Sequence, residues 1–284
     1  MQDNSQIMPG LSQDLHILRL GYGDRVNFVP LLYPVAAGWS GPQSPWKMEL
    51  KNGTPSTLLQ GLLSGDLDAA FVPPAVLMQR GANLQPLGSW CLATEGAAGT
   101  GLLLARERLD GMDGEVVAIS DYAQGSTAEH ILKTLLKPYY SIDLRFLSPG
   151  DPDYSSNGSR LALGDDAARD AQKLPEAWVA EDMGKAWWIY SGLPAVWEML
   201  AVSRDLEARK PGASDAIQAT LRLSQRTAQE QAASLLEEAA GRLGVKRDDI
   251  KALFALQRYN MGDREQKGLA YFLDAATRAR ALGR

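Results

Sequence analysis

Short apolar segments with the character of β-strands alternate with short helical segments over the first 75 residues. In order, they are a strand at 16–22, a helical turn at 27–33, a strand at 46–51, a helix at 54–64 and a strand at 68–72. Thr54 has the side chain of a helix N-cap, and two prolines end the third strand. This β-α-β-α-β order predicts a mostly parallel sheet with right-handed crossovers.

A second series of the same kind begins near Thr100. It consists of strands at 101–107, 115–119 and 142–147, with a helix at 126–136 before the last of them. A loop rich in turn-forming residues, 148–159, then leads to an apolar strand at 161–163 and to a helix opened by Asp165. The middle of the chain is therefore predicted to be a second α/β unit.

The last third of the chain changes character. The run AVWEMLAVS at 195–203 is strand-like, whereas residues 214–284 have apolar residues at helical spacing and no further strand. A length of 284 residues corresponds to about two domains. Two α/β units connected by two extended crossings, near 100–105 and 196–203, predict a two-lobed clamp whose ligand lies in the cleft between the lobes.

The predicted fold class is therefore α/β, with mixed sheets, flanking helices and a helical C-terminal tail that returns to the first unit. The predicted first lobe comprises residues 1–101 and 201–284, and the predicted second lobe comprises residues 102–200. The ligand cleft between these lobes is where we expect functional side chains to meet.

Composition and charge narrow the classes of partner. The chain has 29 basic and 34 acidic residues, a net charge of −5, and no basic block that would neutralise a nucleic-acid backbone. No apolar run approaches the roughly 18 residues that span a bilayer, and the N-terminus lacks the pattern of an export signal. We therefore expect no nucleic acid, no membrane and a cytoplasmic location. The oligomeric state is not readable from the sequence.

Cysteine and histidine usage points away from thiol and metal chemistry. Cys91 is the single cysteine, and its apolar surroundings favour a buried, inert thiol. His16 and His130 are the only histidines, and neither has metal-ligand spacing to another ligand. We predict chemistry that needs neither a thiolate nor a metal.

One glycine motif invites a nucleotide-binding interpretation. Gly21-Tyr22-Gly23 follows a strand, but Val26 occupies the third glycine position of the dinucleotide fingerprint. We interpret these glycines as serving a tight turn from strand to helix. Neither a nucleophile-elbow motif nor a phosphate-binding loop occurs in the chain.

Small polar residues recur where helices are predicted to start. Asn27, Thr54, Ser126 and Thr127 stand at three such starts. The unpaired N–H groups and the positive dipole end of a helix N-terminus suit a carboxylate ligand. Each of these residues is also explained as an ordinary N-cap, and the sequence leaves open whether the three starts converge on one anion site.

Five segments, taken in order, resemble the menaquinone-biosynthesis family of the futalosine route, and within it the chorismate dehydratase branch. They are LGYGDRVNFVPLLY (20–33), LLSGDLDAAFVPPA (62–75), EGAAGTGLLLARERL (95–109), LALGDDAAR (161–169) and MGKAWWIYSGLPAVWEMLAV (183–202). The resemblance covers nearly the whole chain, and the second segment is the most recognisable. The Gly164-Asp165 element favours this branch over the related branch that releases dihydroxynaphthoate.

The resemblance implies a fold like that of type II periplasmic binding proteins and an enzyme that needs no cofactor. The implied reaction removes water from the dicarboxylate chorismate to give 3-[(1-carboxyvinyl)oxy]benzoate. The chain departs from the family at Arg25-Val26, where Tyr-Leu is usual, and at Phe28, which is bulkier than the usual residue. An altered substrate or a lost activity therefore stays open.

The resemblance and the helix starts together define the candidate site residues. Asn27 is the catalytic candidate, because its amide can hydrogen-bond an enolate that develops on the ring carboxylate. The substrate-binding candidates are Thr54, Thr100, Gly101, Ser126, Thr127 and Asp165. The proton acceptor is not readable, and helix capping is a competing role for Asp165. The alternative function is a non-catalytic two-lobed binding protein or paralogue for a small carboxylate.

Overall fold

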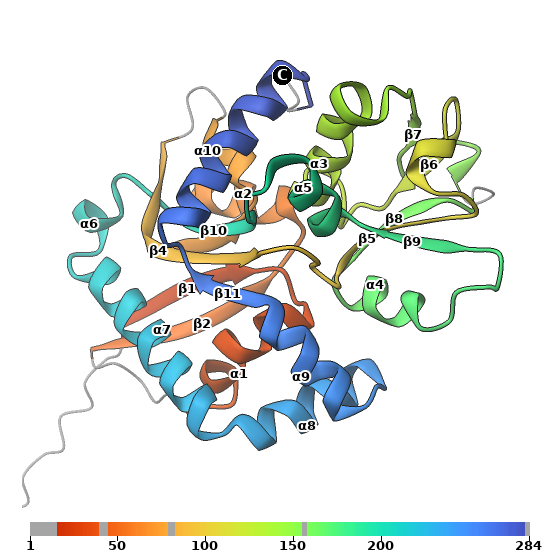
Figure 1. The fold of residues 1–284 in the computed structure, drawn as a ribbon. Helices are drawn as coiled ribbons and strands as arrows, with labels where there is room; N and C mark the ends of the chain where they lie inside the picture. The colour runs from red at the N-terminus through yellow and green to blue at the C-terminus, as the bar shows by residue number, and fades with distance from the viewer. Residues whose placement is uncertain (1–15, 40–44, 79–82, 155–157, 282–284) are drawn as a thin grey trace, which may run out of the picture.

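Two β-sheets, each flanked by helices, make up the protein (Figure 1). The computed structural model describes residues 16–39, 45–78, 83–154 and 158–281. The first sheet has six strands in the order β11-β4-β10-β3-β1-β2, and the second has five in the order β7-β6-β8-β5-β9. No helix in these ranges is long and apolar enough to cross a membrane.

Strands of the first sheet come from both ends of the chain. They are β1 (His16–Tyr22), β2 (Trp46–Asn52), β3 (Ala69–Val72), β4 (Leu84–Thr94), β10 (Ala195–Ser203) and β11 (Gln257–Asn260). Strands of the second sheet come from the middle of the chain. They are β5 (Gly101–Ala105), β6 (Val116–Ile119), β7 (Arg145–Leu147), β8 (Arg160–Leu163) and β9 (Val179–Asp182).

Helices cover the faces of both sheets and dominate the C-terminal third of the chain. The α-helices are α1 (Val29–Ala36), α2 (Pro55–Ser64), α3 (Thr127–Leu135), α4 (Gly164–Ala171), α5 (Met183–Ser191), α6 (Leu206–Arg209), α7 (Ala213–Glu230), α8 (Ala232–Leu243), α9 (Arg247–Leu256) and α10 (Asp263–Arg278). Shorter helical turns are η1 (Val26–Phe28), η2 (Pro74–Met78), η3 (Leu109–Gly111) and η4 (Leu136–Tyr140).

The first sheet is mixed. β1 pairs in parallel with β2 and β3, as the β-α-β-α-β order predicts. β10, however, runs antiparallel to β3 and β4, and β11 runs antiparallel to β4. The prediction of a mostly parallel first sheet was therefore wrong. The chain returns from the second sheet through β10, which runs in the direction opposite to β3 and β4.

The prediction that 214–284 contains no strand was also wrong. β11 lies there, between α9 and α10, and forms an edge of the first sheet (Figure 1). Its sequence, QRYN, has no apolar alternation, so its conformation is set by pairing with β4 rather than by its own pattern. β4 and β9 are two further strands that the sequence pattern did not predict.

The lobe boundaries stay a prediction, but the pairing of β10 bears on one of them. All nine residues of β10 are buried, and its paired residues, from Ala195 to Ser203, join it to the first sheet. The predicted boundary at 200/201 would therefore cut a strand of that sheet. The C-terminal helices contact both halves, since α10 packs on β10 and α3, and α8 packs on η1 and α4.

One continuous core runs through both sheets. Phe28 and Phe71 from the first half and Leu103 and Trp187 from the second belong to the same cluster of fully buried side chains. Burying side chains of this size stabilises the fold by about 1.5–3 kcal/mol each. The two sheets are thus held together by packing as well as by the two chain crossings.

Candidate functional site between the two sheets

A small cavity lies where loops from both sheets meet. Its volume is about 10 Å³, room for about one water molecule. Gly23 and Arg25 follow β1, Tyr122 and Ser126 follow β6, and Glu198 belongs to β10. The wall is completed by residues of β3, α2 and β8 and by residues just after β2 and β3, namely Phe71, Pro55, Leu58, Leu163, Gly53 and Pro73. The carboxyl ends of parallel strands from both sheets converge here, which is where open α/β sheets bind ligands.

A buried ion pair crosses the cavity. The guanidinium Nη2 of Arg25 contacts Oε1 of Glu198, and the two side chains are only 11% and 7% exposed. The guanidinium also lies against the rings of Phe28 and Tyr122, 5.7 and 5.8 Å from their centroids. Burial lowers the pKa of Arg25, yet a guanidinium remains protonated in proteins. The cavity therefore contains a fixed positive charge and its counter-charge.

Two glycines make room for the Arg25 side chain. A Cβ atom on Gly164, at the start of α4, would lie 2.5 Å from both Cγ and Cδ of Arg25. A Cβ atom on Gly23 would lie 2.9 Å from Nε of Arg25 and 3.0 Å from the hydroxyl of Tyr122. The φ of Gly23 lies outside the left-handed region. Gly23 therefore allows close approach of Arg25 and Tyr122, and its predicted service in a tight turn from strand to helix stays a prediction.

Polar atoms without hydrogen-bond partners gather at this cavity. Within the described residues, seven buried side-chain atoms lack a partner. Three of them belong to residues that line the cavity, namely Nε of Arg25, the hydroxyl of Tyr122 and Oε2 of Glu198. A fourth is Oδ1 of Asn27, two residues after Arg25. Each such group costs about 1–3 kcal/mol when it is buried unpaired. A cluster of them beside a cavity indicates a site built to receive a polar ligand.

Asn27 and Thr100 are brought together. The Nδ2 atom of Asn27 donates a 2.9 Å hydrogen bond to Oγ1 of Thr100, and both residues are buried. The hydroxyl of Tyr259 donates a 2.7 Å hydrogen bond to the backbone carbonyl of Asn27. Asn27 is therefore fixed at its side chain and at its backbone, two residues after Arg25.

Ser126 and Thr127 begin α3 but use their hydroxyls differently. Ser126 lines the cavity, and its Oγ accepts a 3.2 Å hydrogen bond from the backbone N–H of Glu129 as the N-cap. Thr127 donates a 2.6 Å hydrogen bond to the backbone carbonyl of Trp197, the residue before Glu198. Thr127 therefore ties α3 to β10, and of the two only Ser126 lies at the cavity wall.

Thr54 and Gly101 lie beside the cavity without lining it. Thr54 caps α2 through a 3.3 Å hydrogen bond from the backbone N–H of Thr57, and the residues on either side of it line the cavity. Gly101 opens β5, where a Cβ atom would make ordinary contacts with Ala128 and Trp197. Their predicted roles in substrate binding stay predictions.

Asp165 fastens the segment that carries the site. Its Oδ1 accepts a 2.7 Å hydrogen bond from the backbone N–H of Val26, and its Oδ2 pairs with Nε of Arg242 at 2.6 Å. Arg242 in turn contacts the carboxylate of Asp24 at 2.7 Å. Both oxygens of Asp165 are thus engaged in positioning residues 24–27, and its predicted contact with substrate stays a prediction.

Three cavity residues were not among the predicted site residues. Arg25 was noted only as a departure from the family, and Tyr122 and Glu198 were not singled out. Glu198 does carry a signal, because it is the one charged residue in the apolar run AVWEMLAVS. A carboxylate in a fully buried strand needs a partner or a function. Arg25 and Tyr122 have no comparable signal.

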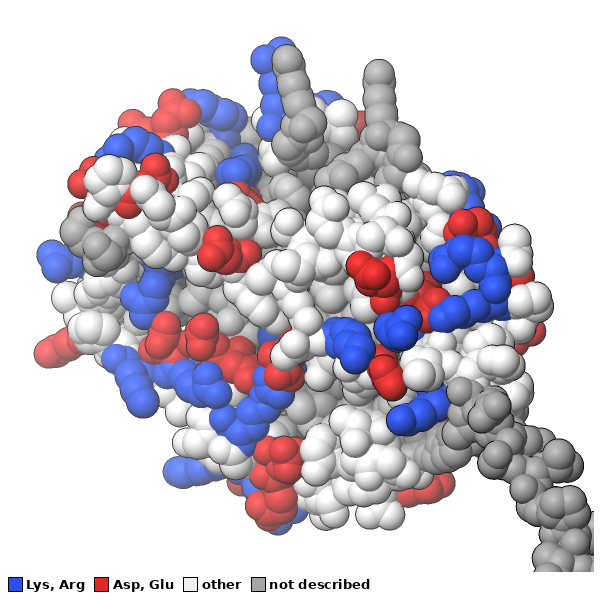
Figure 2. All heavy atoms as spheres, turned by 180° about the vertical axis from the view of Figure 1, so that it is seen from behind, with Lys and Arg blue, Asp and Glu red and all other residues white. Residues whose placement is uncertain are grey.

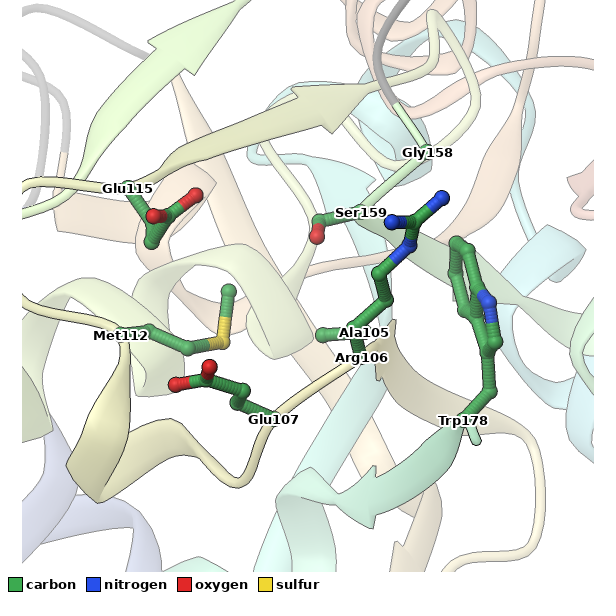
Figure 3. Close-up of a pocket in the computed structure, with 8 residues that line it drawn as sticks. All are labelled: Ala105, Arg106, Glu107, Met112, Glu115, Gly158, Ser159 and Trp178. Atoms are coloured by element: carbon green, nitrogen blue, oxygen red, sulfur yellow. The ribbon is translucent and has the colours of Figure 1, made fainter. Parts of the chain in front are cut away.

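A larger hollow lies elsewhere and lacks these features. Its volume is about 360 Å³, and Figure 3 shows Arg106 beside Trp178, with Glu107 and Glu115 on the other side. Arg106 and Glu107 are exposed. None of the unpartnered buried atoms of the described chain belongs to its lining residues. Acidic and basic side chains also intermingle over the face in Figure 2, so surface charge does not mark a competing site there.

Two mixed sheets joined by crossings, with a polar cavity between them, define the two-lobed fold of periplasmic-binding-protein type. The structure resembles protein AF1704 from Archaeoglobus fulgidus, with a TM-score of 0.74 and 16% identity over 93% of this chain and 97% of that one. It also resembles the alkanesulfonate-binding protein SsuA from Xanthomonas axonopodis pv. citri, with a TM-score of 0.67 and 14% identity over 95% and 96%. The periplasmic aliphatic sulphonate binding protein SsuA from Escherichia coli gives 0.63 and 13% over 92% and 86%.

The sequence assigns the chain within this fold class. The profile of the menaquinone biosynthesis family matches residues 18–278, almost the whole chain. The chain therefore belongs to the menaquinone biosynthesis family, as its five resembling segments indicated. The expected fold and the expected family are both confirmed.

Proposed function

We propose that this protein is a chorismate dehydratase, which removes water from chorismate to give 3-[(1-carboxyvinyl)oxy]benzoate. The observation that carries the proposal is the cluster of unpartnered buried polar atoms on Arg25, Asn27, Tyr122 and Glu198. Arg25, Tyr122 and Glu198 line a cavity between the lobes, and Asn27 follows Arg25 by two residues, in a chain of the menaquinone biosynthesis family. Chorismate offers carboxylate oxygens as acceptors for the donors of Arg25 and Tyr122, and its ring hydroxyl is a donor for an acceptor oxygen of Asn27 or Glu198.

The reaction sets clear requirements for the site. The proton leaves from the ring carbon that bears the enolpyruvyl ether, and the hydroxyl leaves from the neighbouring carbon. The electrons of the broken C–H bond spread through the ring diene onto the ring carboxylate, and the product ring is aromatic. A site for this reaction therefore needs partners for two carboxylates, a donor for the enolate, a proton acceptor and exclusion of water.

The cavity offers partners for these charges. Arg25 takes the enolpyruvyl carboxylate, since its guanidinium is a buried fork of donors. Ser126, also at the cavity wall, and the N-terminal N–H groups of α3 favour a second negative charge there. Nδ2 of Asn27 gives one of its two hydrogens to Thr100 and donates the second to the enolate that develops on the ring carboxylate.

The lobes must open to admit the substrate. A cavity of about 10 Å³ is far smaller than the pockets of about 300–1,000 Å³ that hold ligands of drug size. Hinged opening and closure is the usual behaviour of two-lobed binding folds. Closure around bound chorismate would then remove water from the reacting ring and strengthen each polar contact.

The test is to mix purified protein with chorismate, with no metal or cofactor added, and to follow the mass of the product. The expected result is a product lighter by one water with the aromatic absorption of the enolpyruvyl benzoate. Unchanged chorismate together with a rise in Tm would contradict the enzyme and support the alternative, a non-catalytic binding paralogue. Unchanged chorismate with no rise in Tm would remove chorismate as the ligand.

A further inference from the structure

Glu198 is a carboxylate in a place where a carboxylate is costly. It lies in the middle of β10, whose nine residues are all buried, and its side chain is 7% exposed. Its Oε1 pairs with Arg25, but its Oε2 is buried with no partner in the described part of the chain. A half-satisfied buried charge is destabilising, and such groups cluster at functional sites.

Glu198 is also the one cavity residue suited to accept a proton. Arg25 is a cation, and the pKa of Tyr122 is raised, chiefly by burial. The wall otherwise consists of Ser126, glycines, prolines and apolar side chains. The two histidines of the chain, His16 and His130, do not line the cavity. Glu198 is therefore the only carboxylate, and the only candidate general base, at the cavity wall among the described residues.

We propose that Glu198 is the catalytic base, and that Arg25 is shared between Glu198 in the free protein and the substrate in the complex. This inference rests on the proposed function. The enolpyruvyl carboxylate of chorismate takes over the Arg25 guanidinium, which leaves Glu198 with weaker charge compensation in a cavity from which water has been excluded. Loss of a paired cation and of water both make a carboxylate more basic. The base is thus activated by the binding of its own substrate.

Binding of the enolpyruvyl carboxylate by Arg25 also brings the reacting carbon of the substrate close to Glu198. The enolpyruvyl ether sits on the ring carbon that loses the proton. A carboxylate of that ether held by Arg25 brings this carbon to the residue paired with Arg25, which is Glu198. Tyr122 and Phe28, which lie against the guanidinium, limit its movement.

The chemistry balances with a single carboxylate. Glu198 removes the proton from the ether-bearing carbon, and the electron pair moves through the diene to the ring carboxylate. The pair then returns to form the aromatic ring while the carbon–oxygen bond of the hydroxyl breaks. Because the ether and the hydroxyl are trans in chorismate, the departing proton and hydroxyl lie on the same face. Glu198 can therefore return its proton to the leaving hydroxyl, which departs as water, and regain its charge.

The first measurement compares Glu198→Gln with wild type and with Glu181→Gln. Glu181 is also a paired glutamate, 16% exposed and bound to Arg108, but it does not line the cavity. We expect Glu198→Gln to lower kcat by about 10²–10⁴-fold, the contribution of a general base. Glu181→Gln should leave kcat within about twofold of wild type, because Glu181 lies outside the cavity and its partner Arg108 is exposed.

The second measurement separates a chemical role from a structural one. In Glu198→Ala, added formate should restore turnover in a concentration-dependent manner, because a small carboxylate can enter the space of the lost side chain. Chloride at equal ionic strength should not restore it. If Glu198 only stabilised the fold, formate would not restore turnover to Glu198→Ala.

The outcomes distinguish the two proposals. If wild type converts chorismate and Glu198→Gln converts it within tenfold of the wild-type rate, Glu198 is not the base and the proposed function stands. If wild type does not convert chorismate, both proposals fall. If neither Glu198→Gln nor Glu198→Ala folds, Glu198→Asp decides, because it keeps the charge but withdraws the carboxylate. A lower kcat in that variant supports the base, and an unchanged kcat overturns it.

Discussion

The hydroxyl of Tyr259 donates a hydrogen bond to the backbone carbonyl of Asn27 across a separation of 232 residues in sequence. Tyr259 belongs to β11, which was not predicted as a strand. Asn27 is the residue predicted from the sequence to be catalytic. The side chain of Asn27 is held in addition by Thr100, at the first crossing between the sheets. Its amide is therefore oriented before any ligand arrives, which is the condition for efficient stabilisation of a developing charge.

Asn27→Ala should lower kcat for chorismate by about 10²-fold or more, the usual effect of removing one oxyanion donor. Binding of chorismate, followed by the shift in Tm, should persist because the other partners of the carboxylates remain. The matched control is Asn260→Ala, an exposed asparagine at the end of β11. Near-normal turnover of Asn27→Ala would remove this residue from the mechanism.

Asp165→Ala should destabilise the protein, because the carboxylate accepts from Val26 and pairs with Arg242. Hydrogen bonds to charged groups contribute about 1.5–3 kcal/mol, and we expect a loss of that size in the free energy of unfolding in urea. Asp166→Ala is the control, because Asp166 is the next residue in the chain and its side chain is 83% exposed. Unchanged stability of Asp165→Ala with loss of chorismate binding would instead favour direct contact between Asp165 and the substrate.

Gly164→Ala should be more destabilising than an ordinary glycine substitution at positive φ. Gly164 has a φ of +58° and no room for a Cβ atom beside Arg25, whereas Gly244 has a φ of +68° and open space around it. Gly244→Ala therefore measures backbone strain alone, and the excess loss in Gly164→Ala, about 1–3 kcal/mol, measures overpacking. Equal losses in the two variants would show that Arg25 moves away without cost.

The stability of the protein should fall as the pH is lowered through about 6.5, partly because of His130. Burial lowers the pKa of this histidine in α3. Over the window between the lowered pKa and the ordinary value, the unfolded chain binds a proton that the folded chain does not. Unfolding free energies at about pH 7.5 and 5.5 should therefore differ less in His130→Gln than in wild type. His16→Gln, which changes the exposed histidine, should keep the wild-type difference. Identical differences in all three proteins would contradict a neutral His130.

Cys91 should resist thiol reagents while the protein is folded. It is fully buried in β4, and burial raises its pKa to about 12. At about pH 8 only a fraction of about 10⁻⁴ of such a thiol is the reactive thiolate. Dithionitrobenzoate should release one equivalent of thionitrobenzoate in guanidinium chloride and almost none in buffer. Rapid stoichiometric labelling of the folded protein would contradict this burial.

The elements that the sequence predicted are those with a pattern of their own. β1, α2 and β3 have apolar runs bounded by a cap or by prolines, and α3 begins at its predicted N-cap, Ser126. β4, β9 and β11 were not predicted, because β4 includes a proline and a glycine and because β9 and β11 are short edge strands. Such strands are defined by their neighbours, which only the folded structure supplies.

Some residues of the candidate site were likewise predictable from the sequence, and others were not. The family resemblance led to Asn27 and Thr100, and the structure places these two residues in contact. Arg25, Tyr122 and Glu198 meet only because a loop after β1, a loop after β6 and the middle of β10 converge on one cavity. No local pattern encodes that convergence. The charge of Glu198 inside an apolar strand was visible in the sequence, but its partner was not.

The order of strands in the first sheet also dictates when the protein can finish folding on the ribosome. β4 pairs with β10 on one side and with β11 on the other, and both partners are synthesised long after it. A nascent chain that has emerged only as far as the second unit therefore carries an eleven-residue strand with two vacant edges. Vacant apolar edges invite intermolecular pairing. The first sheet can be completed only after residue 260, the last residue of β11, has left the exit tunnel.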